Sequence, residues 1–170
     1  MQSPSAQVFL GLGSNLGDRL ATLDAGLRAL EALGFRTRAL SSRYETEPVG
    51  GPAQGWYVNA VVRGETELPP RQLLEACLHV ERQLGRERRV RWEARTLDLD
   101  LLLYGDLVLD EPGLRVPHPR LCERRFVLEP LAELAPELRH PLLGLRVAEL
   151  LERCPDVSAV RRLAAAGARG

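Results

Sequence analysis

The sequence predicts an α+β fold of the ferredoxin-like class, a sandwich in which helices pack on one mainly antiparallel sheet. Three observations support this. Apolar residues spaced by three or four mark two helices, short apolar or alternating runs mark four strands, and the order is strand, helix, strand, strand, helix, strand. We expect a small hairpin and C-terminal helices to follow. The 170 residues are interpreted as one domain, 1–170, with a core at about 8–141 and a helical extension over 142–170.

The first strand is expected at Val8–Leu12, a short apolar run, and a helix follows it. Between them, the polar and glycine-rich stretch 13–18 predicts a turn with a Ser or Asn cap. Leucines spaced by three or four residues predict that the helix covers 20–33 and ends at Gly34.

Two strands and a second helix are expected next. The strands cover about 35–46 and 56–65, and a loop rich in proline and glycine separates them. Pro69 and Pro70 open the second helix, which stops at Gly85.

The clearest strand of the chain is expected at 96–104, after an arginine-rich loop. A turn-rich hairpin over 105–116 follows it. Short helical stretches are then expected from about Arg120, at 128–134 and at 147–153.

Composition and charge exclude several classes of function. Lys+Arg and Asp+Glu both number 23, so the formal net charge is zero, which argues against a general nucleic-acid or membrane-surface binder. No run approaches the roughly 18 apolar residues of a membrane span, and we expect no signal peptide. Three cysteines without a CxxC pair indicate reduced thiols in a cytoplasmic protein. Lysine is absent, which excludes a P-loop.

The glycines at 11, 13 and 17 have the spacing GxGxxxG after the first strand. A dinucleotide-binding unit needs GxGxxG and a crossover helix between its second and third strands. Neither is present, so a glycine-permitted turn is the better interpretation.

Asp98 and Asp100 are the most informative polar pair. Leucines alternate with them in the predicted strand, so both carboxylates point to the face opposite the buried one. At about 3.3 Å per residue they lie roughly 7 Å apart. Such a pair can bind hard cations such as Mg²⁺, with phosphate oxygens and water completing the shell. Two solvent-facing acids on an exposed strand are the alternative.

The loop before the aspartates carries arginines at 86, 88, 89, 91 and 95, together with Trp92. Arginines beside metal-binding acids are typical of phosphoryl transfer, and the loop fits a lid over a nucleotide; a solvated loop is the alternative. His118, between two prolines and upstream of Arg124, suits phosphate binding better than metal ligation, although a structural turn explains it equally well.

Tyr57 and Asn59 share one face of the third predicted strand. An aromatic ring with a carboxamide two residues on can stack on a flat heterocycle and hydrogen-bond its edge. A tyrosine at the sheet margin beside a turn-capping asparagine is the alternative. Glu81, on a largely apolar helix face, is either a boundary residue or a carboxylate that supports the site.

Taken together, five segments resemble the 6-hydroxymethyl-7,8-dihydropterin pyrophosphokinases of folate biosynthesis. They are LGSNLGDR at 12–19, SRYETEPVG at 42–50, YVNA at 57–60, RTLDLD at 95–100 and VPHPR at 116–120. The resemblance runs from about Val8 to Pro141, and the RTLDLD and PHP motifs in this order and spacing are highly specific.

The resemblance implies an ATP-dependent transferase. It would move pyrophosphate from ATP to the hydroxymethyl group of 6-hydroxymethyl-7,8-dihydropterin, giving AMP and the pterin diphosphate. It implies two Mg²⁺ ions bound by Asp98 and Asp100, with Arg86 and Arg95 also catalytic. The implied ATP-binding residues are Arg86, Arg88, Trp92, Arg95, His118 and Arg124. The implied pterin-binding residues are Thr46, Val49, Tyr57, Asn59 and Phe126.

Two other classes stay compatible with the residues alone. One is a ferredoxin-like nucleic-acid-binding module, against which the zero net charge counts. The other is a metal-dependent phosphohydrolase, which the aspartate pair permits but which does not need Tyr57 and Asn59. We expect the partners to be small-molecule substrates, without nucleic acid or membrane, and we favour a monomer.

Overall fold

The computed structural model describes residues 4–15, 18–47, 56–84 and 97–164. In chain order its elements are β1 (Ala6–Ser14), α1 (Arg19–Ala32), β2 (Phe35–Leu40), β3 (Tyr44–Thr46), β4 (Tyr57–Thr66), α2 (Pro70–Leu84), β5 (Asp98–Tyr104), β6 (Leu109–Glu111), β7 (Leu114–Val116), the 3₁₀ helix η1 (Leu121–Glu123), α3 (Arg125–Leu134), α4 (Val147–Glu152) and β8 (Val160–Arg162). Among these residues, no helix is long and apolar enough to cross a membrane.

The main sheet is six-stranded, with the order β5-β1-β4-β3-β8 and with β2 also paired to β4. Every pairing in it is antiparallel. β1 and β2 both flank β4 and therefore run parallel to each other, and α1 makes the crossover between them. α2 makes the equivalent crossover from β4 to β5. This split βαβ arrangement confirms the predicted ferredoxin-like class, and the predicted hairpin is the separate β6-β7 pair.

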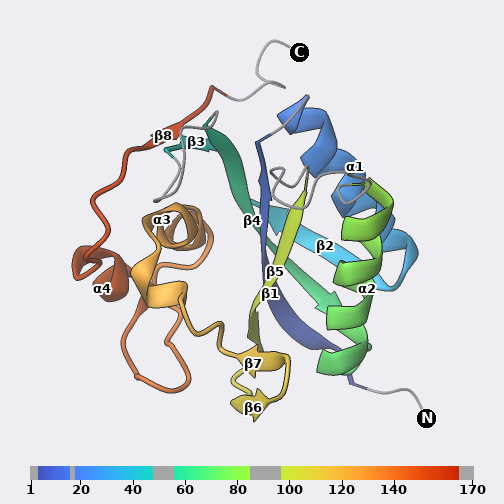
Figure 1. The fold of residues 1–170 in the computed structure, drawn as a ribbon. Coiled ribbons are helices and arrows are strands. Elements are labelled where there is room, and N and C mark those ends of the chain that lie inside the picture. Colours follow the sequence, from blue (N-terminus) through green and yellow to red (C-terminus); the bar gives the residue numbers. More distant parts are fainter. Residues whose placement is uncertain (1–3, 16–17, 48–55, 85–96, 165–170) are drawn as a thin grey trace.

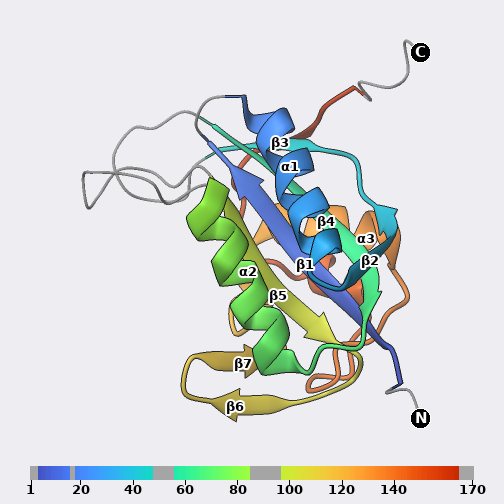
Figure 2. The ribbon, with the colours of Figure 1, turned by 90° about the vertical axis from the view of Figure 1, so that its right-hand side faces the viewer.

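Helices cover both faces of the sheet (Figure 1). α1 and α2 lie side by side on one face, as Figure 2 also shows, over a core that includes Leu30, Leu73 and Leu99. α3 and α4 lie on the other face, where they enclose a second core around Phe9 and Leu128. The second face is only partly covered, because α3 lies over the middle of β4 and leaves the ends of β1 and β5 open for a pocket.

Two local predictions were wrong. The expected turn at 13–18 with a Ser or Asn cap is not present in that form, because Gly13 and Ser14 belong to β1, which pairs with β4 on one side and, as far as Gly13, with β5 on the other. The N-cap of α1 is Asp18, whose carboxylate accepts a hydrogen bond from the Ala21 N–H at 3.1 Å.

The single strand expected at 35–46 is two strands, β2 and β3, joined by a bend at Ser41. The backbone N–H of Ser41 donates to the Val61 carbonyl, and its hydroxyl accepts from the Val61 N–H, both at 2.9 Å. The hydroxyl therefore replaces a ladder bond at the bend, so both strands stay paired with β4.

The C-terminal extension contains a strand that the sequence did not predict. α4 lies where a helix was expected, and β8 then pairs antiparallel with β3, so that Val160 faces Thr46. The extension thus returns to the main sheet and becomes its edge.

Candidate active site

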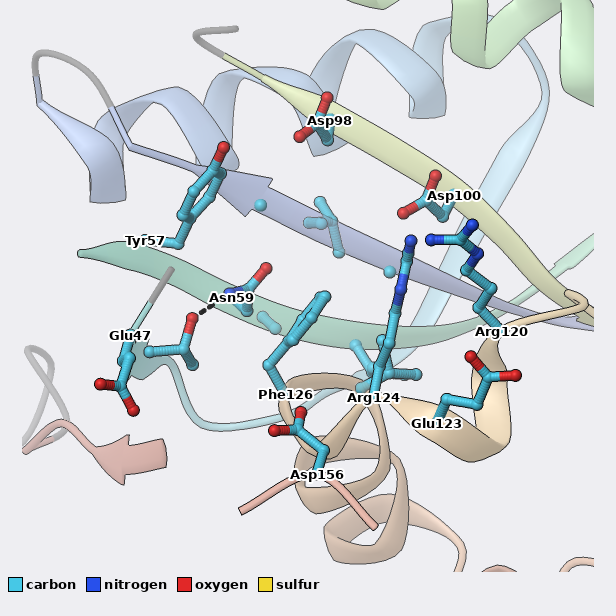
Figure 3. A pocket seen from close by; sticks show the side chains of 17 residues that line it. Glu47, Tyr57, Asn59, Asp98, Asp100, Arg120, Glu123, Arg124, Phe126 and Asp156 are labelled. Carbon is cyan, nitrogen blue, oxygen red and sulfur yellow. Dashed lines mark hydrogen bonds between the residues drawn. The ribbon is translucent and has the colours of Figure 1, made fainter. Parts of the chain in front are cut away.

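A pocket of about 320 Å³ lies on the open part of the sheet face that carries α3 (Figure 3). Its lining residues come from β1, β3, β4, β5, η1 and α3 and from the segments that connect such elements. They are Gly11, Leu12, Gly13, Thr46, Glu47, Tyr57, Asn59, Ala60, Val61, Asp98, Asp100, Arg120, Glu123, Arg124, Phe126, Val127 and Asp156.

The floor of the pocket is formed by paired residues of the adjacent strands β4, β1 and β5. Gly13 pairs with Asn59 of β4 on one side and with Asp98 of β5 on the other. Gly11 pairs with Asp100 in the same way. Because the two β1 residues that face the pocket floor are glycines, Gly11 and Gly13, no side chain separates the aspartates from the amide. Of these two, only at Gly13 would a Cβ atom come too close to a neighbour, the Asn59 Oδ1, so this glycine serves the pocket floor and not the turn that the sequence suggested.

Asp98 and Asp100 form the acidic end of the pocket and point into it from β5 (Figure 3). The intervening Leu99 is buried on the opposite face, as the alternation predicted. Glu81 of α2 is also buried, and its Oε2 accepts a hydrogen bond from the Leu99 N–H at 2.7 Å. This bond anchors the backbone between the two aspartates, so Glu81 supports the site rather than lying at a boundary.

Two arginines reach toward the acidic end from the opposite wall. Arg120 precedes η1, and Arg124 directly precedes α3. His118 is half-buried in the same segment, and its Nδ1 accepts a hydrogen bond from the Arg120 N–H at 3.1 Å. Burial, and then the positive charges of Arg124 and Arg120, lower the pKa of His118 to about 4. The neutral ring therefore carries its proton on Nε2, where it can donate.

The other end of the pocket combines aromatic rings with an amide. Tyr57 and Asn59 come from β4, and Phe126 from the first turn of α3, with Arg124 lying 5.6 Å from the Phe126 ring centroid. The buried Asn59 donates a hydrogen bond from Nδ2 to Thr46 Oγ1 at 2.6 Å. This bond fixes the amide, so its carbonyl oxygen lies toward Gly13 at the floor. A flat, polar-edged ligand fits such an end.

The structure brings together most of the described residues that the sequence singled out. Thr46, Tyr57, Asn59, Asp98, Asp100, Arg124 and Phe126 all line the pocket, whereas His118 does not line it and is hydrogen-bonded to the lining residue Arg120. Val49, Arg86, Arg88, Trp92 and Arg95 lie outside the described residues.

Several lining residues were missed by the sequence analysis. Arg120 and Glu123 belong to the segment that carries His118 and Arg124, and an arginine directly after the Pro-His-Pro motif was a usable signal. Glu47 directly follows Thr46 in the segment 42–50, so its position was also a usable signal. Asp156 had none, because only the course of the C-terminal segment brings it to the pocket.

Sequence comparison with known proteins identifies close relatives. Residues 9–136 match the family of 7,8-dihydro-6-hydroxymethylpterin-pyrophosphokinases (HPPK). A 2-amino-4-hydroxy-6-hydroxymethyldihydropteridine pyrophosphokinase of Pseudomonas aeruginosa is 45% identical over 150 residues, covering 88% of this chain and 92% of that protein. The enzyme of the same name from Methylorubrum extorquens is 43% identical over 158 residues, covering 92% and 98%.

Solved structures share the fold at low sequence identity. A structure titled as HPPK-DHPS in complex with substrates has a TM-score of 0.70 at 11% identity, covering 89% of this chain and 43% of that one. The wild-type Plasmodium falciparum HPPK-DHPS with pterin and p-hydroxybenzoate gives 0.68 at 15% identity, covering 90% and 42%. This chain thus spans less than half of those solved chains, and the likeness to them concerns the fold.

Proposed function

This chain belongs to the 7,8-dihydro-6-hydroxymethylpterin-pyrophosphokinase family, and we propose that the pocket above is its active site, with ATP at the aspartate end and the pterin at the Tyr57 end. The chain is an ATP-dependent diphosphotransferase of folate biosynthesis: it transfers pyrophosphate from ATP to the hydroxymethyl group of 6-hydroxymethyl-7,8-dihydropterin, leaving AMP and the pterin diphosphate. The observation that carries the assignment is that one pocket holds both the aspartate pair and the Tyr57–Asn59–Phe126 group.

Asp98 and Asp100 are proposed to hold two Mg²⁺ ions. These two carboxylates lie two residues apart on β5, opposite the glycines of β1, and supply the oxygen ligands that Mg²⁺ prefers. Within the described residues no three His, Cys, Asp or Glu side chains converge on a metal position. Ions bound here therefore need further oxygens, and triphosphate oxygens and water are suitable. The ions would neutralise the charge that develops on the transferred phosphates.

The arginines are proposed to bind the phosphates. Arg124 reaches into the pocket opposite Asp100 (Figure 3), and His118 can donate to the nucleotide from Nε2, because its Nδ1 is already engaged. For Arg86, Arg88, Trp92 and Arg95, which lie outside the described residues, the assignment depends on the motif alone.

The pterin is proposed to lie between Tyr57 and Phe126, with its polar edge toward Asn59, Thr46 and Val49. In this arrangement the pterin hydroxymethyl oxygen attacks the β-phosphorus of ATP. The bond from the β-phosphorus to the oxygen that bridges it to the α-phosphorus breaks, AMP leaves with that oxygen, and the hydroxyl proton passes to the surroundings. The protein contributes orientation of the two substrates and fixed charges around the phosphates.

The test is AMP release from ATP and Mg²⁺, with and without 6-hydroxymethyl-7,8-dihydropterin. Pterin-dependent AMP without free phosphate supports the proposal. Phosphate release that needs no pterin would instead indicate a metal-dependent phosphohydrolase. A folded, Mg²⁺-loaded protein that releases no AMP would contradict the assignment and favour a binding module, which a salt-dependent gel shift with nucleic acid would then have to show.

We also propose that residues 1–170 act as a single pyrophosphokinase domain, monomeric and cytoplasmic, with the two small molecules as its only partners. The three cysteines are all free thiols, as a reducing compartment permits. Sedimentation at micromolar concentration and cell fractionation test these points, and a stable dimer or a membrane-bound fraction would contradict them.

A further inference from the structure

The segment 154–163, which we call the C-terminal arm, runs from the end of α4 along the rim of the pocket to the sheet edge (Figure 1). At its start, Asp156 lines the pocket directly beneath Phe126 (Figure 3). Its Oδ2 accepts a hydrogen bond from the Arg125 N–H at 3.0 Å, and its Oδ1 accepts one from the Ser158 N–H at 2.9 Å.

The Asp156 carboxylate thereby caps α3 at its N-terminus. The side chain of the N-cap residue Arg124 makes no capping hydrogen bond, so the cap comes from the arm instead. Burial raises the pKa of Asp156, but the hydrogen bonds from Ser158 and Arg125 outweigh it, so the pKa lies below its ordinary value and the group is ionised at neutral pH. The two residues that flank Arg125, Arg124 and Phe126, both line the pocket.

The far end of the same arm is bonded to the opposite wall. Ala159 donates to Glu47 Oε1 at 2.8 Å and accepts from the Glu47 N–H at 3.1 Å. β8 then pairs with β3, so that Val160 faces Thr46. Arg161 binds Glu45 at 2.7 Å and lies 5.2 Å from the Trp56 ring centroid, next to Tyr57.

The two walls are joined differently at their two ends. Away from the pocket, α3 contacts β3 directly, because the Tyr44 hydroxyl donates to Glu133 Oε1 at 2.7 Å. At the pocket end Phe126 and Thr46 both line the cavity, and the arm is hydrogen-bonded to both walls, to Arg125 on one and to Glu47 on the other. A flat ring bound at this end has to fit between the Phe126 wall and the Thr46 wall, so the distance between these walls matters for its binding.

We propose that the C-terminal arm is a clamp that sets the width of the pterin end, and that Asp156 is a positioning residue for Phe126 and Arg124. The proposal rests on the proposed function, since it takes this end of the pocket to bind the pterin. Asp156 acts through the α3 backbone, and Arg161 acts through Glu45 and Trp56. The two attachments share no contact, so their effects on pterin binding are coupled only if the arm transmits them.

The experiment measures pterin and ATP dissociation constants separately, together with kcat and Tm, for Asp156→Ala, Asp156→Asn, Arg161→Ala and the Asp156→Ala/Arg161→Ala double variant. Glu137→Ala is the matched control, because it removes an exposed ion pair with Arg146 just before α4 and contacts neither wall. Asp156→Ala is expected to raise the pterin Kd about fivefold or more and the ATP Kd by less. Asp156→Asn, which keeps one acceptor oxygen, is expected to lie between it and the wild type.

The double variant decides whether the arm couples the walls. A clamp that is loosened at one end transmits less from the other, so the rise in pterin Kd in the double variant should be smaller than the product of the two single rises. A rise equal to that product would mean that each attachment supports its own wall, and would overturn the clamp. A lower Tm with unchanged pterin Kd would reduce Asp156 to a helix cap and overturn it as well.

If Asp156→Ala does not fold, Asp156→Asn combined with Arg161→Ala gives the same comparison. A wild-type protein that binds neither pterin nor ATP would refute the proposed function. A wild-type protein that releases AMP normally, with variants indistinguishable from it, would refute only the clamp.

Discussion

The Oδ1 atom of Asn59 lies 2.6 Å from the position that a Cβ atom on Gly13 would occupy. The two residues face each other across the β1-β4 ladder, and Gly13 also faces Asp98 across the β1-β5 ladder. A side chain at position 13 would therefore displace the Asn59 amide at the point where the Tyr57 end of the pocket meets the aspartate end.

Gly13→Ala is expected to weaken pterin binding. The methyl group would force the Asn59 amide away from its hydrogen bond with Thr46, so we expect the KM for the pterin to rise about tenfold, or about 1.4 kcal/mol. The KM for ATP should change much less. Initial-rate measurements with each substrate varied in turn check this split.

The control for this variant uses Asn59→Ala as a background. Once the amide has been removed, the added methyl group at position 13 has nothing to displace. Gly13→Ala should then raise the KM for the pterin by less than about twofold. A full tenfold rise in that background would mean that the methyl group acts on something other than Asn59.

Thr46→Val is expected to free the Asn59 amide by removing its hydrogen-bond acceptor, the Thr46 Oγ1. Valine has the shape of threonine but lacks Oγ1, which accepts the 2.6 Å hydrogen bond from Asn59 Nδ2. Both residues are buried, so the amide loses a partner that water does not easily replace, at a cost of about 1–2 kcal/mol in the free energy of unfolding. The KM for the pterin should rise several-fold.

Thr46→Ser is the matched control, since it keeps the hydroxyl and removes only a methyl group. Urea unfolding and steady-state kinetics on the two variants separate the effects. Equal losses of pterin affinity in both would show that packing of the methyl group matters and the hydrogen bond does not.

The aspartate end of the pocket follows closely from the sequence. Alternation of leucine with Asp98 and Asp100 on a strand determines which face the carboxylates occupy, because strand side chains alternate regardless of the rest of the fold. Tyr57 and Asn59 could be placed on a common face for the same reason. Each of these predictions needed only the period of a single strand.

The remaining lining residues depend on pairing between distant segments. Asp156 reaches the pocket only because β8 returns to β3, and the polar sequence of β8 gives no strand signal of its own. Gly13 was interpreted as a turn residue because a glycine pattern before a helix suggests a turn, whereas the register with β4 and β5 decides its role. Register is a tertiary property, so a local pattern could not reveal it.

His118 is expected to make the protein less stable as the pH falls from about 6.5 toward 4. Burial, with the nearby charges of Arg124 and Arg120, lowers its pKa to about 4 in the folded state. The unfolded chain therefore takes up a proton in this window before the folded protein does, which favours unfolding. After allowance for partial exposure, we expect roughly 1 kcal/mol of lost stability between pH 6.5 and pH 5.

His118→Gln removes this titration. The free energy of unfolding of this variant should therefore fall less between pH 6.5 and pH 5, by the same roughly 1 kcal/mol. Urea unfolding at several pH values measures it, with His79→Gln on α2 as the comparison variant. Profiles that stay parallel for the wild type and His118→Gln would show that His118 titrates alike in both states.

Asp98→Asn and Asp100→Asn are each expected to lower kcat by about a thousandfold or more while leaving the protein folded. Asparagine keeps the size of the side chain and one oxygen, but it loses the charge that would hold Mg²⁺. Rates over a range of Mg²⁺ concentrations, with circular dichroism on the same samples, check both halves of this prediction. Asp110→Asn is the control, because that carboxylate is exposed on the β6-β7 hairpin and pairs only with Arg115 among the described ion pairs. If either Asp98→Asn or Asp100→Asn kept near-wild-type turnover at low Mg²⁺, the two-metal assignment would have to be abandoned, because a single carboxylate would then suffice.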